Sequence, residues 1–434
     1  MHSPSSSASP AQVPAPRPLA LVVDITGTSV NYNHGLSKAL VEYPEVVFRT
    51  APYFGDRNAF RNSVLKQDYL RAATWLVDRW PGVVRHRRLW KAIQLHGYLS
   101  GWRDVLRETT RNRIPVLHIQ WCKVPFVDRW MMKLAQRRGI RIVYTAHNAL
   151  PYGDRRESVR RAYRKLYRQA DALVVLSRFV GQMLLERVDD SVAGKIHVIE
   201  HGVLELERPL PNRQQALAEL KLPPDAEVVL FVGRISAYKG IADLIDAVAI
   251  ARRDRPALRL IIAGDPEEPF ELYQARIRRL GLTENVQSHP VFVPEAFKST
   301  LYAAADVAIM PHREASQSAM GLEALAVGKP IIATRTGGLV ELVEDGVNGY
   351  SVPVSDPPAM AQAITRFFSL PPSEQNAMAV ASRALGQDRF AWSTIAHKHV
   401  VLYREVAEAV TATVPATPTR GRALEVASSG APDK

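Results

Sequence analysis

The sequence predicts an α/β protein built from two doubly wound domains that face each other across a cleft. Short apolar runs that fit buried strands alternate with segments of helical periodicity, and many of these runs end at Gly, His or Ser. This alternation is typical of parallel β/α/β units. The chain has 434 residues, too many for one typical core and enough for two domains of ordinary size.

The predicted strands fall into two series. The first series covers residues 19–23, 46–50, 116–119, 141–145, 172–176 and 196–199. The second covers residues 228–232, 259–263, 286–289, 307–310 and 330–333. The stretch 204–225 between them contains Pro, Asn and Glu, so we expect the break between the domains there. Sheets of this type bind ligands at the carboxyl ends of their strands, which places the expected site in the cleft.

The tails and this break give the predicted domain limits. Residues 1–17 and 411–434 are poor in large apolar groups, so we expect both to be disordered tails. An N-terminal Rossmann-like domain is predicted over 18–205 and a C-terminal one over 206–390. A helix over residues 391–410 is expected to pack back toward the N-terminal domain.

The chain carries a net charge of +13, from 56 basic and 43 acidic residues, which favours acidic partners such as nucleotides or anionic lipid surfaces. One predicted helix is crowded with basic residues, namely Arg155, Arg156, Arg160, Arg161, Arg164, Lys165 and Arg168. Its other face carries Val159, Ala162, Tyr163, Leu166 and Tyr167. The pattern fits a solvated face of a packed helix and also a peripheral contact with an anionic membrane. Residues 75–90, with their Trp and Arg side chains, fit buried tryptophans or a membrane interface.

The single cysteine, Cys122, excludes an internal disulfide, and we expect it to be a packing residue. No Cys/His cluster with zinc-ligand spacing and no Asp-x-Asp occurs, so we expect no metal and no cofactor. No apolar run approaches 18 residues, and the run 19–23 is cut short by Asp24, unlike the core of a signal peptide. We therefore expect a cytoplasmic protein, with the inner face of the membrane as a peripheral location.

The segment VVLFVGRISAYK, residues 228–239, suits the gripping of a diphosphate. A buried strand ends at Gly233 and Arg234, and Lys239 then enters a helical pattern that begins near Gly240. A second segment, EASQSAMGLEALAVGK, predicts a helix over residues 319–327 with Ser318 as its cap and Gly328 as its stop. Free amides at that helix start can share the charge of a phosphorylated leaving group with the two cations.

Four segments together resemble a known family. They are FVGRISAYKGIADLIDA, LRLIIAGDP, ADVAIMPHREASQSAMGLEALAVGKPIIAT and TGGLVELVEDGVNGYSVPVSD, and their order and spacing are similar to the retaining glycosyltransferases of family 4. The likeness runs over residues 19–403 and implies the GT-B architecture. It implies transfer of a hexose-type sugar from a nucleotide-diphosphate sugar to an acceptor hydroxyl with retention, in polysaccharide, glycolipid or glycoconjugate biosynthesis. The N-terminal domain would then bind the acceptor and the C-terminal domain the nucleotide sugar.

The resemblance implies roles for residues of the C-terminal domain. Arg234 and Lys239, next to Gly233, would hold the donor diphosphate. Glu323 resembles the second acid of the family's EX7E element, which accepts hydrogen bonds from the ribose. The helical pattern places Leu322, Leu325 and Ala326 on the packing face, so we expect Glu323 on a different side, free to meet a ligand.

The first acid departs from the family pattern. Eight residues rather than seven separate Glu314 from Glu323, so Ala315 occupies the matching position unless a loop residue displaces Glu314. Glu314 is interpreted as a sugar-binding residue or as a cap of the following helix. The side chains and amides at the helix start that are expected to meet the donor sugar and distal phosphate are Ser316, Gln317, Ser318, Ala319 and Met320.

The N-terminal domain supplies the remaining candidates. His147 in YTAHNALP follows a predicted strand and resembles the family histidine that points into the cleft at the donor sugar. Gly27 in DITGTS follows the first strand and would let a loop approach the phosphates or the acceptor, although the family's double glycine is missing. Residues 201–203 resemble a strand-end signature and are interpreted as a turn beside a hinge near 204–213.

Other functions remain open at this point. A nucleotide-sugar 2-epimerase uses the same architecture, and a natural-product glycosyltransferase would use the same site. The positive charge alone fits nucleic acid, but no RNP, KH or zinc-finger motif accompanies it, so we expect none as a partner. The acceptor classes that fit are a saccharide, a lipid-linked saccharide and a small aglycone.

Overall fold

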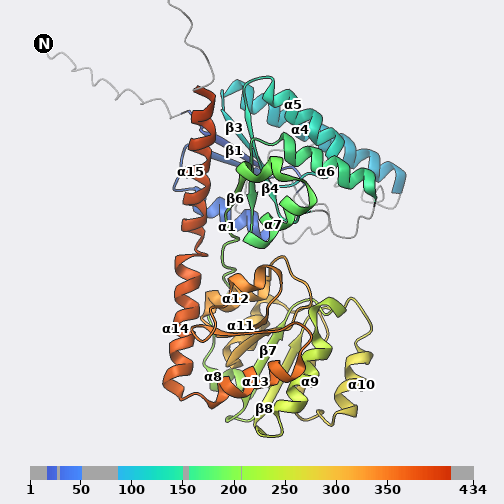
Figure 1. The fold of residues 1–434 in the computed structure, drawn as a ribbon, viewed down its shortest axis with the longest axis vertical. Helices are drawn as coiled ribbons and strands as arrows, with labels where there is room; N and C mark the ends of the chain where they lie inside the picture. Colours follow the sequence, from blue (N-terminus) through green and yellow to red (C-terminus); the bar gives the residue numbers. More distant parts are fainter. Residues whose placement is uncertain (1–16, 27–29, 51–86, 150–155, 207, 412–434) are drawn as a thin grey trace, which may run out of the picture.

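A computed structural model describes residues 17–26, 30–50, 87–149, 156–206 and 208–411. The predictions for Gly27, for Arg155, for most of the segment 75–90 and for nearly all of the two tails fall outside the described residues. Figure 1 shows two α/β units, one above the other, with the last two helices running along one side of both.

The N-terminal unit contains a parallel sheet of six strands in the order β2-β1-β3-β4-β5-β6. Its strands are β1 (Ala20–Asp24), β2 (Val46–Thr50), β3 (Val116–Ile119), β4 (Arg141–Ala146), β5 (Ala172–Val175) and β6 (Ile196–Val198). The helices of this unit are α1 (Val30–Leu40), α4 (Arg87–Arg111), α5 (Pro125–Gln136), α6 (Glu157–Gln169) and α7 (Arg178–Arg187). The sheet is therefore the doubly wound parallel sheet that the sequence predicts.

The C-terminal unit contains a second parallel six-stranded sheet in the order β12-β11-β10-β7-β8-β9. Its strands are β7 (Glu227–Val232), β8 (Leu258–Ala263), β9 (Val286–His289), β10 (Val307–Met310), β11 (Ile331–Thr334) and β12 (Gly349–Val352). Its helices are α8 (Arg213–Glu219), α9 (Ile241–Ala251), α10 (Glu271–Arg279), α11 (Glu295–Ala304), α12 (Ala319–Val327) and α13 (Pro357–Ser369). Short 3₁₀ helices include η3 (Ala237–Lys239) and η4 (Gly337–Glu341).

All strands predicted from the sequence are present, and their ends differ from the prediction by at most one residue. Among the described residues, β12 is the one strand that was not predicted, because GYSV offers two large apolar residues and no longer run. Most of these strands read as continuous apolar runs because helices cover both faces of a parallel sheet. The strands could therefore be predicted from the apolar runs in the sequence.

Each sheet has its own core. In the N-terminal unit one buried cluster, including Trp102 and Tyr167, lies on the side of α4, α5, α6 and α7. A second, including Leu36 and Tyr403, lies on the side of α1 and the last helix. The C-terminal unit has one continuous cluster around β7 and β10. Cys122 is buried in the first of these clusters, as a packing residue should be.

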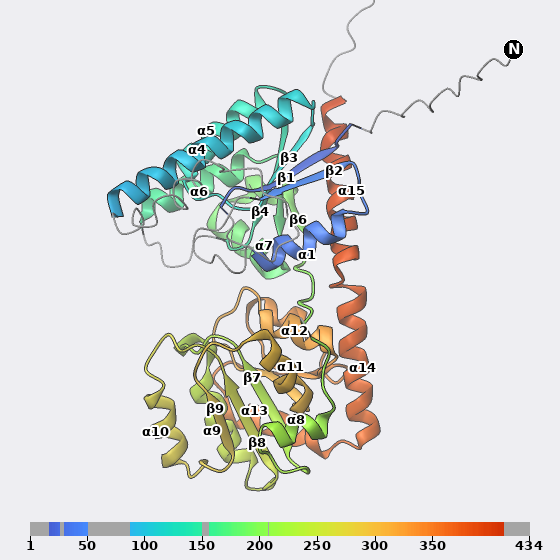
Figure 2. The same cartoon turned by 180° about the vertical axis from the view of Figure 1, so that it is seen from behind.

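The last two helices are α14 (Pro372–Asp388) and α15 (Trp392–Thr411). Figures 1 and 2 show α14 beside the C-terminal unit and α15 beside the N-terminal one. Tyr403 of α15 reaches the N-terminal core, where its hydroxyl lies 2.6 Å from His118 Nδ1. The chain thus crosses between the units twice, once before α8 and once between α14 and α15.

Candidate functional site

The carboxyl ends of the two sheets face each other, and the loops that follow the strands meet there. Gln317 Nε2 of the C-terminal unit donates to Leu176 O at 2.7 Å, and Ser316 Oγ lies 3.2 Å from Asn148 Oδ1. A pocket between the units is lined by residues of both, among them Ser177, Ser318 and Glu341. A ligand site is expected at this edge of each sheet.

Lys239 lies at the end of η3, in the loop after β7. Its ammonium donates to His312 Nε2 at 2.8 Å, and His312 follows the neighbouring strand β10. Gly240 makes this approach possible, since its φ is +68° and a Cβ there would lie 1.9 Å from Pro311 O. A cation is therefore held against the end of β10 by a backbone that only glycine permits.

Burial sets the charge states of this pair. It lowers the pKa of Lys239 to about 8, and the charge of Arg234 adds to the effect. Burial and the nearby Lys239 lower the pKa of His312 to about 3, so the imidazole is neutral and accepts a hydrogen bond from the lysine ammonium group. At neutral pH the Lys239 ammonium group is a partly buried positive charge to which no carboxylate of the described residues is bonded. Such a cation favours the approach of an anion.

Arg234 follows Gly233 at the end of β7, but its side chain points to a surface partner. Its Nη1 lies 2.6 Å from Glu267 Oε1, and both side chains are largely exposed. This hydrogen bond raises the pKa of Arg234. Exposed ion pairs are weak, so an incoming phosphate can compete for the guanidinium at little cost.

Helix α12 begins at the interface of the two units. Ser318 is the N-cap, and its Oγ accepts from Gly321 N at 3.3 Å, while Gly328 ends the helix in the left-handed conformation. The start, the end and both caps were predicted correctly. Ala319 is exposed at the first turn, whereas Met320 is buried and its sulfur accepts from Val232 N at 3.4 Å.

The prediction that Glu323 lies on an open side of α12 is wrong, because α11 covers that side, and its ribose role stays a prediction. Its side chain is 8% exposed, with Lys298 Nζ at 2.9 Å and the Tyr302 hydroxyl at 3.0 Å. Both partners belong to α11, which packs over this side of α12. Burial lowers the pKa of Lys298, but the carboxylates of Glu323 and Glu295 together outweigh burial and leave this pKa raised.

Glu314 is exposed and makes no hydrogen bond or ion pair within the described part of the chain. Its interpretation as the cap of the following helix is wrong, because Ser318 fills that position. Ser316 and Gln317, expected at the donor sugar, are bonded to Asn148 and Leu176 across the interface.

His147 follows β4 and lies in an aromatic cluster. Trp121 stacks on it with ring centroids 4.7 Å apart and an interplanar angle of 8°, and Tyr32 meets it edge-on at 5.2 Å. Burial first, and His201 second, lower the pKa of His147 to about 3, against a backbone hydrogen bond to Gln120. Its Nε2 is buried without a hydrogen-bond partner among the described residues. The bond to Gln120 therefore uses Nδ1, and Nε2 is an acceptor.

Residues 201–203 form a tight connection between the units. A Cβ at Gly202 would lie 2.3 Å from the indole of Trp392, whose Nε1 donates to Val203 O at 2.9 Å. The His201 ring packs against the same indole. The start of α15 thus holds the first crossing of the chain.

Three residues of the site were not predicted from the sequence, namely Trp121, Lys298 and His312. His312 and Trp121 were detectable, since each follows a predicted buried strand as His147 does. Lys298 gave no such signal, because it lies in the middle of a helix and reaches the site only through tertiary packing.

Two family models match the chain. The model described as glycosyltransferase family 4 matches residues 32–204, and the model described as glycosyl transferases group 1 matches residues 212–384. A D-inositol 3-phosphate glycosyltransferase of Saccharomonospora viridis is 32% identical over 321 residues, which are 69% of this chain and 69% of that protein.

The chain belongs to glycosyltransferase family 4.

This glycosyltransferase has the GT-B fold. HepE of Anabaena, solved in complex with UDP, superposes with a TM-score of 0.65 at 18% identity, covering 89% of this chain and 99% of HepE. Sucrose-phosphate synthase of Thermosynechococcus elongatus superposes with a TM-score of 0.64 at 21% identity, covering 90% of this chain and 99% of that chain. As a member of family 4, the chain is a retaining enzyme that transfers a sugar from a nucleotide sugar.

Two further findings bear on the glycosyltransferase. Within the described ranges, no three or more His, Cys, Asp or Glu side chains are placed to hold a metal ion together. None of the helices that the structure describes has the length and apolarity to cross a membrane.

Proposed function

We propose that the enzyme transfers a hexose from a nucleotide-diphosphate sugar to an acceptor hydroxyl, with Lys239 as the main cation on the departing diphosphate. The observation that carries this proposal is the 2.8 Å contact between Lys239 and neutral His312. It presents an ammonium group at the carboxyl edge of the sheet, and no acidic side chain in the described part of the chain is bonded to it. A diphosphate supplies the negative charge that pairs with this ammonium group.

The start of α12 provides the second part of the diphosphate site. The amides of Ala319 and Met320 lie in its first turn, and Ser318 satisfies only the amide of Gly321. Free amides at a helix start carry a partial positive charge and favour phosphate groups. Arg234 follows Gly233 at the end of β7. Its guanidinium adds to the site when its ion pair with Glu267 breaks.

The donor sugar is assigned to the space between the two units. There Nε2 of His147, which has no hydrogen-bond partner among the described residues, accepts a hydrogen bond from a sugar hydroxyl. The exposed carboxylate of Glu314 accepts hydrogen bonds from other sugar hydroxyls. Ser316 and Gln317 border the same space. Glu323 is assigned to the ribose, since Lys298 and Tyr302 occupy only part of the acceptor capacity of its carboxylate.

The reaction follows from charge. As the glycosidic bond breaks, negative charge grows on the diphosphate oxygens, and Lys239 with the α12 amides stabilises it more in the transition state than in the ground state. The diphosphate oxygen then takes the proton of the acceptor hydroxyl, which attacks from the face that the leaving group vacates. This course retains the anomeric configuration without a covalent enzyme intermediate.

The acceptor is assigned to the N-terminal unit, over residues 18–205, and the donor to residues 206–390, with the hinge near 204–213. A saccharide, a lipid-linked saccharide and a small aglycone are the candidate acceptors. D-inositol 3-phosphate is a further candidate acceptor, because the name of a relative at 32% identity contains it.

Two experiments test this function. A thermal-shift screen with UDP, GDP, ADP and TDP should raise the melting temperature with one preferred nucleotide. Sugar transfer is then assayed with the matching nucleotide sugar, and NMR of the product reports the anomeric configuration. Stabilisation by none of the four nucleotides, or an inverted product, contradicts the proposal.

A nucleotide-sugar 2-epimerase is the alternative on this fold. It needs acids and bases around the sugar, and His147 with Glu314 is a thin set, since a pKa of about 3 makes His147 a poor base. Incubation with nucleotide sugar and no acceptor separates the two, because only an epimerase isomerises the sugar alone.

A further inference from the structure

Helices α4 and α5 form a ridge on one side of the N-terminal sheet. Figures 1 and 2 show them side by side, farther from the C-terminal unit than α6. They run in the same direction, because α4 precedes and α5 follows the same strand, β3. Asp128 of α5 links the two helices, because its carboxylate accepts hydrogen bonds from two side chains of α4, Trp102 Nε1 at 2.9 Å and the Tyr98 hydroxyl. These hydrogen bonds hold α4 and α5 in a fixed position relative to each other.

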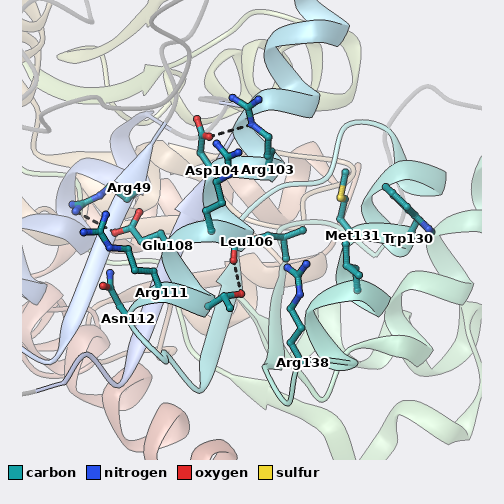
Figure 3. A pocket seen from close by; sticks show the side chains of 13 residues that line it. Arg49, Arg103, Asp104, Leu106, Glu108, Arg111, Asn112, Trp130, Met131 and Arg138 are labelled. Carbon is teal, nitrogen blue, oxygen red and sulfur yellow. Dashed lines mark hydrogen bonds and ion pairs between the residues drawn. The ribbon is translucent and has the colours of Figure 1, made fainter.

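One half of the ridge is an open groove rich in arginine. Its volume is about 1130 Å³, which makes it a larger hollow than the pocket between the units. The side chains drawn in Figure 3 come from β2, from the C-terminal half of α4 and from α5 with the turn after it. The charged residues are five arginines and two acids, namely Arg49, Arg103, Arg107, Arg111, Arg138, Asp104 and Glu108.

The charges of this groove do not balance. Arg49 lies 3.3 Å from Glu108, and Arg103 lies 3.5 Å from Asp104. Arg107, Arg111 and Arg138 have no acidic partner in the part of the chain that the structure describes, and Figure 3 shows Arg111 and Arg138 without a bonded carboxylate. The groove therefore carries an excess of three positive charges, which attract an anionic surface.

The other half of the ridge exposes large apolar side chains. On α4 these are Leu95, 47% exposed, and Leu99, 38% exposed. On α5 they are Phe126, 59% exposed, and Trp130, 61% exposed. Each pair is spaced four residues apart, so its members lie on one face of their helix. Trp130 also lines the arginine groove, so the apolar and basic halves are continuous.

We propose that this ridge, which we call the α4–α5 surface, docks the enzyme on an anionic lipid bilayer. Phosphate head groups match the three unpaired arginines, and Trp and Phe are side chains that insert at the boundary of head groups and acyl chains. Nucleic acid would match the arginines but would give Leu95 and Leu99 no reason to be exposed. A second protein copy would need acidic residues opposite the arginines.

The proposal is independent of the transfer reaction, because it is tested by binding alone. The full chain is sedimented with vesicles of phosphatidylcholine and with vesicles in which a third of the lipid is phosphatidylglycerol. We expect binding only to the anionic vesicles, and its loss as salt rises. Equal binding to both vesicle types, or no binding to either, overturns the proposal.

Variants locate the surface. The triple variant R107Q/R111Q/R138Q should lower the vesicle partition coefficient about 100-fold, and Trp130→Ala about tenfold. The matched control is R253Q/R278Q/R279Q, which removes the same number of positive charges from exposed positions of the C-terminal unit, and Leu272→Ala is the control for Trp130→Ala. Since all these side chains are exposed, the variants should fold, and circular dichroism checks this. Retained vesicle binding by the triple variant, or equal loss in the control, overturns the assignment. A mass doubled in solution by wild type but not by Trp130→Ala would instead identify a dimer interface.

Discussion

Lys239 and His312 form a hydrogen bond of 2.8 Å between the loops that follow two neighbouring strands, β7 and β10. The imidazole is neutral, so it fixes the direction of the ammonium group without cancelling its charge. An acidic partner in the same position would compete with a phosphate. This choice of partner is the feature on which the proposed donor site depends.

Removing the ammonium group should therefore impair catalysis more than folding. We expect Lys239→Ala to lower kcat/KM about 100- to 1000-fold, the range seen when one group that stabilises developing charge is removed. The variant is assayed with the preferred nucleotide sugar, and its melting temperature serves as the folding control. Near-normal transfer by a folded Lys239→Ala protein would show that this lysine does not hold the diphosphate.

The pKa of Lys239, about 8, predicts a limit on the alkaline side. Lysine is cationic below its pKa, so kcat/KM should be level up to about pH 8 and then fall about tenfold per pH unit. The same profile is recorded for Lys239→Ala, in which this alkaline limb should be absent. An unchanged limb in the variant would assign it to another group.

The unpartnered Nε2 of His147 predicts a modest and selective loss. We expect His147→Ala to lower kcat/KM for sugar transfer about tenfold, the cost of one buried hydrogen bond to a sugar hydroxyl. Binding of the free nucleoside diphosphate, measured by calorimetry, should be unchanged because it lacks the sugar. Equal weakening of nucleotide binding would place His147 elsewhere than at the sugar.

The buried Glu323 predicts a structural as well as a functional effect. Glu323→Ala leaves the Tyr302 hydroxyl with only its 3.2 Å contact to Met320 O and Lys298 with Glu295 alone, so we expect the free energy of unfolding to fall by about 2–3 kcal/mol. Glu314→Ala removes an exposed, unbonded carboxylate and should change it by less than about 0.5 kcal/mol. Urea denaturation compares the two. Similar values would mean that the contacts of Glu323 contribute nothing to stability.

Buried histidines predict acid sensitivity. Burial lowers the pKa of His147 and His312 to about 3 and that of His201 and His399 to about 4, against about 6.5 in the unfolded chain. Below about pH 6.5 the unfolded state thus binds more protons than the folded state, so the free energy of unfolding falls with falling pH. Asp128, with its pKa raised to about 6 by burial, acts in the opposite direction between about pH 4 and pH 6.

Urea denaturation between pH 5 and pH 7 measures this slope. In His399→Gln the slope should be smaller by about one proton, because Gln does not titrate. A slope that is equal in wild type and variant would mean that His399 is protonated in the folded state as readily as in the unfolded state.

Much of the fold was predictable because its signals are local. Buried parallel strands are continuous apolar runs, and α12 carries its own start and stop at Ser318 and Gly328. The environment of Glu323 was not predictable, because its partners Lys298 and Tyr302 lie 25 and 21 residues away on another helix. The periodicity of α12 shows which face is apolar, and it says nothing about a polar neighbour that covers the opposite face.

The site, like the fold, was predictable where its signals are local and not where they depend on tertiary packing. Lys239, His147 and the start of α12 could be named as candidates because each follows a strand or a cap that the sequence marks. That Ser316 and Gln317 bond to the other unit, and that Lys239 meets His312, depends on how the two sheets and their loops are packed. The α4–α5 surface was missed because its exposed apolar residues form a face only when two helices lie side by side.

Calorimetric titration with the preferred nucleoside diphosphate tests the central claim most directly. We predict one binding site per chain in wild type and an affinity at least about tenfold weaker in Lys239→Ala, because the variant loses the buried cation of the diphosphate site. Absence of nucleotide binding in wild type, or equal affinity in the two proteins, would contradict the account.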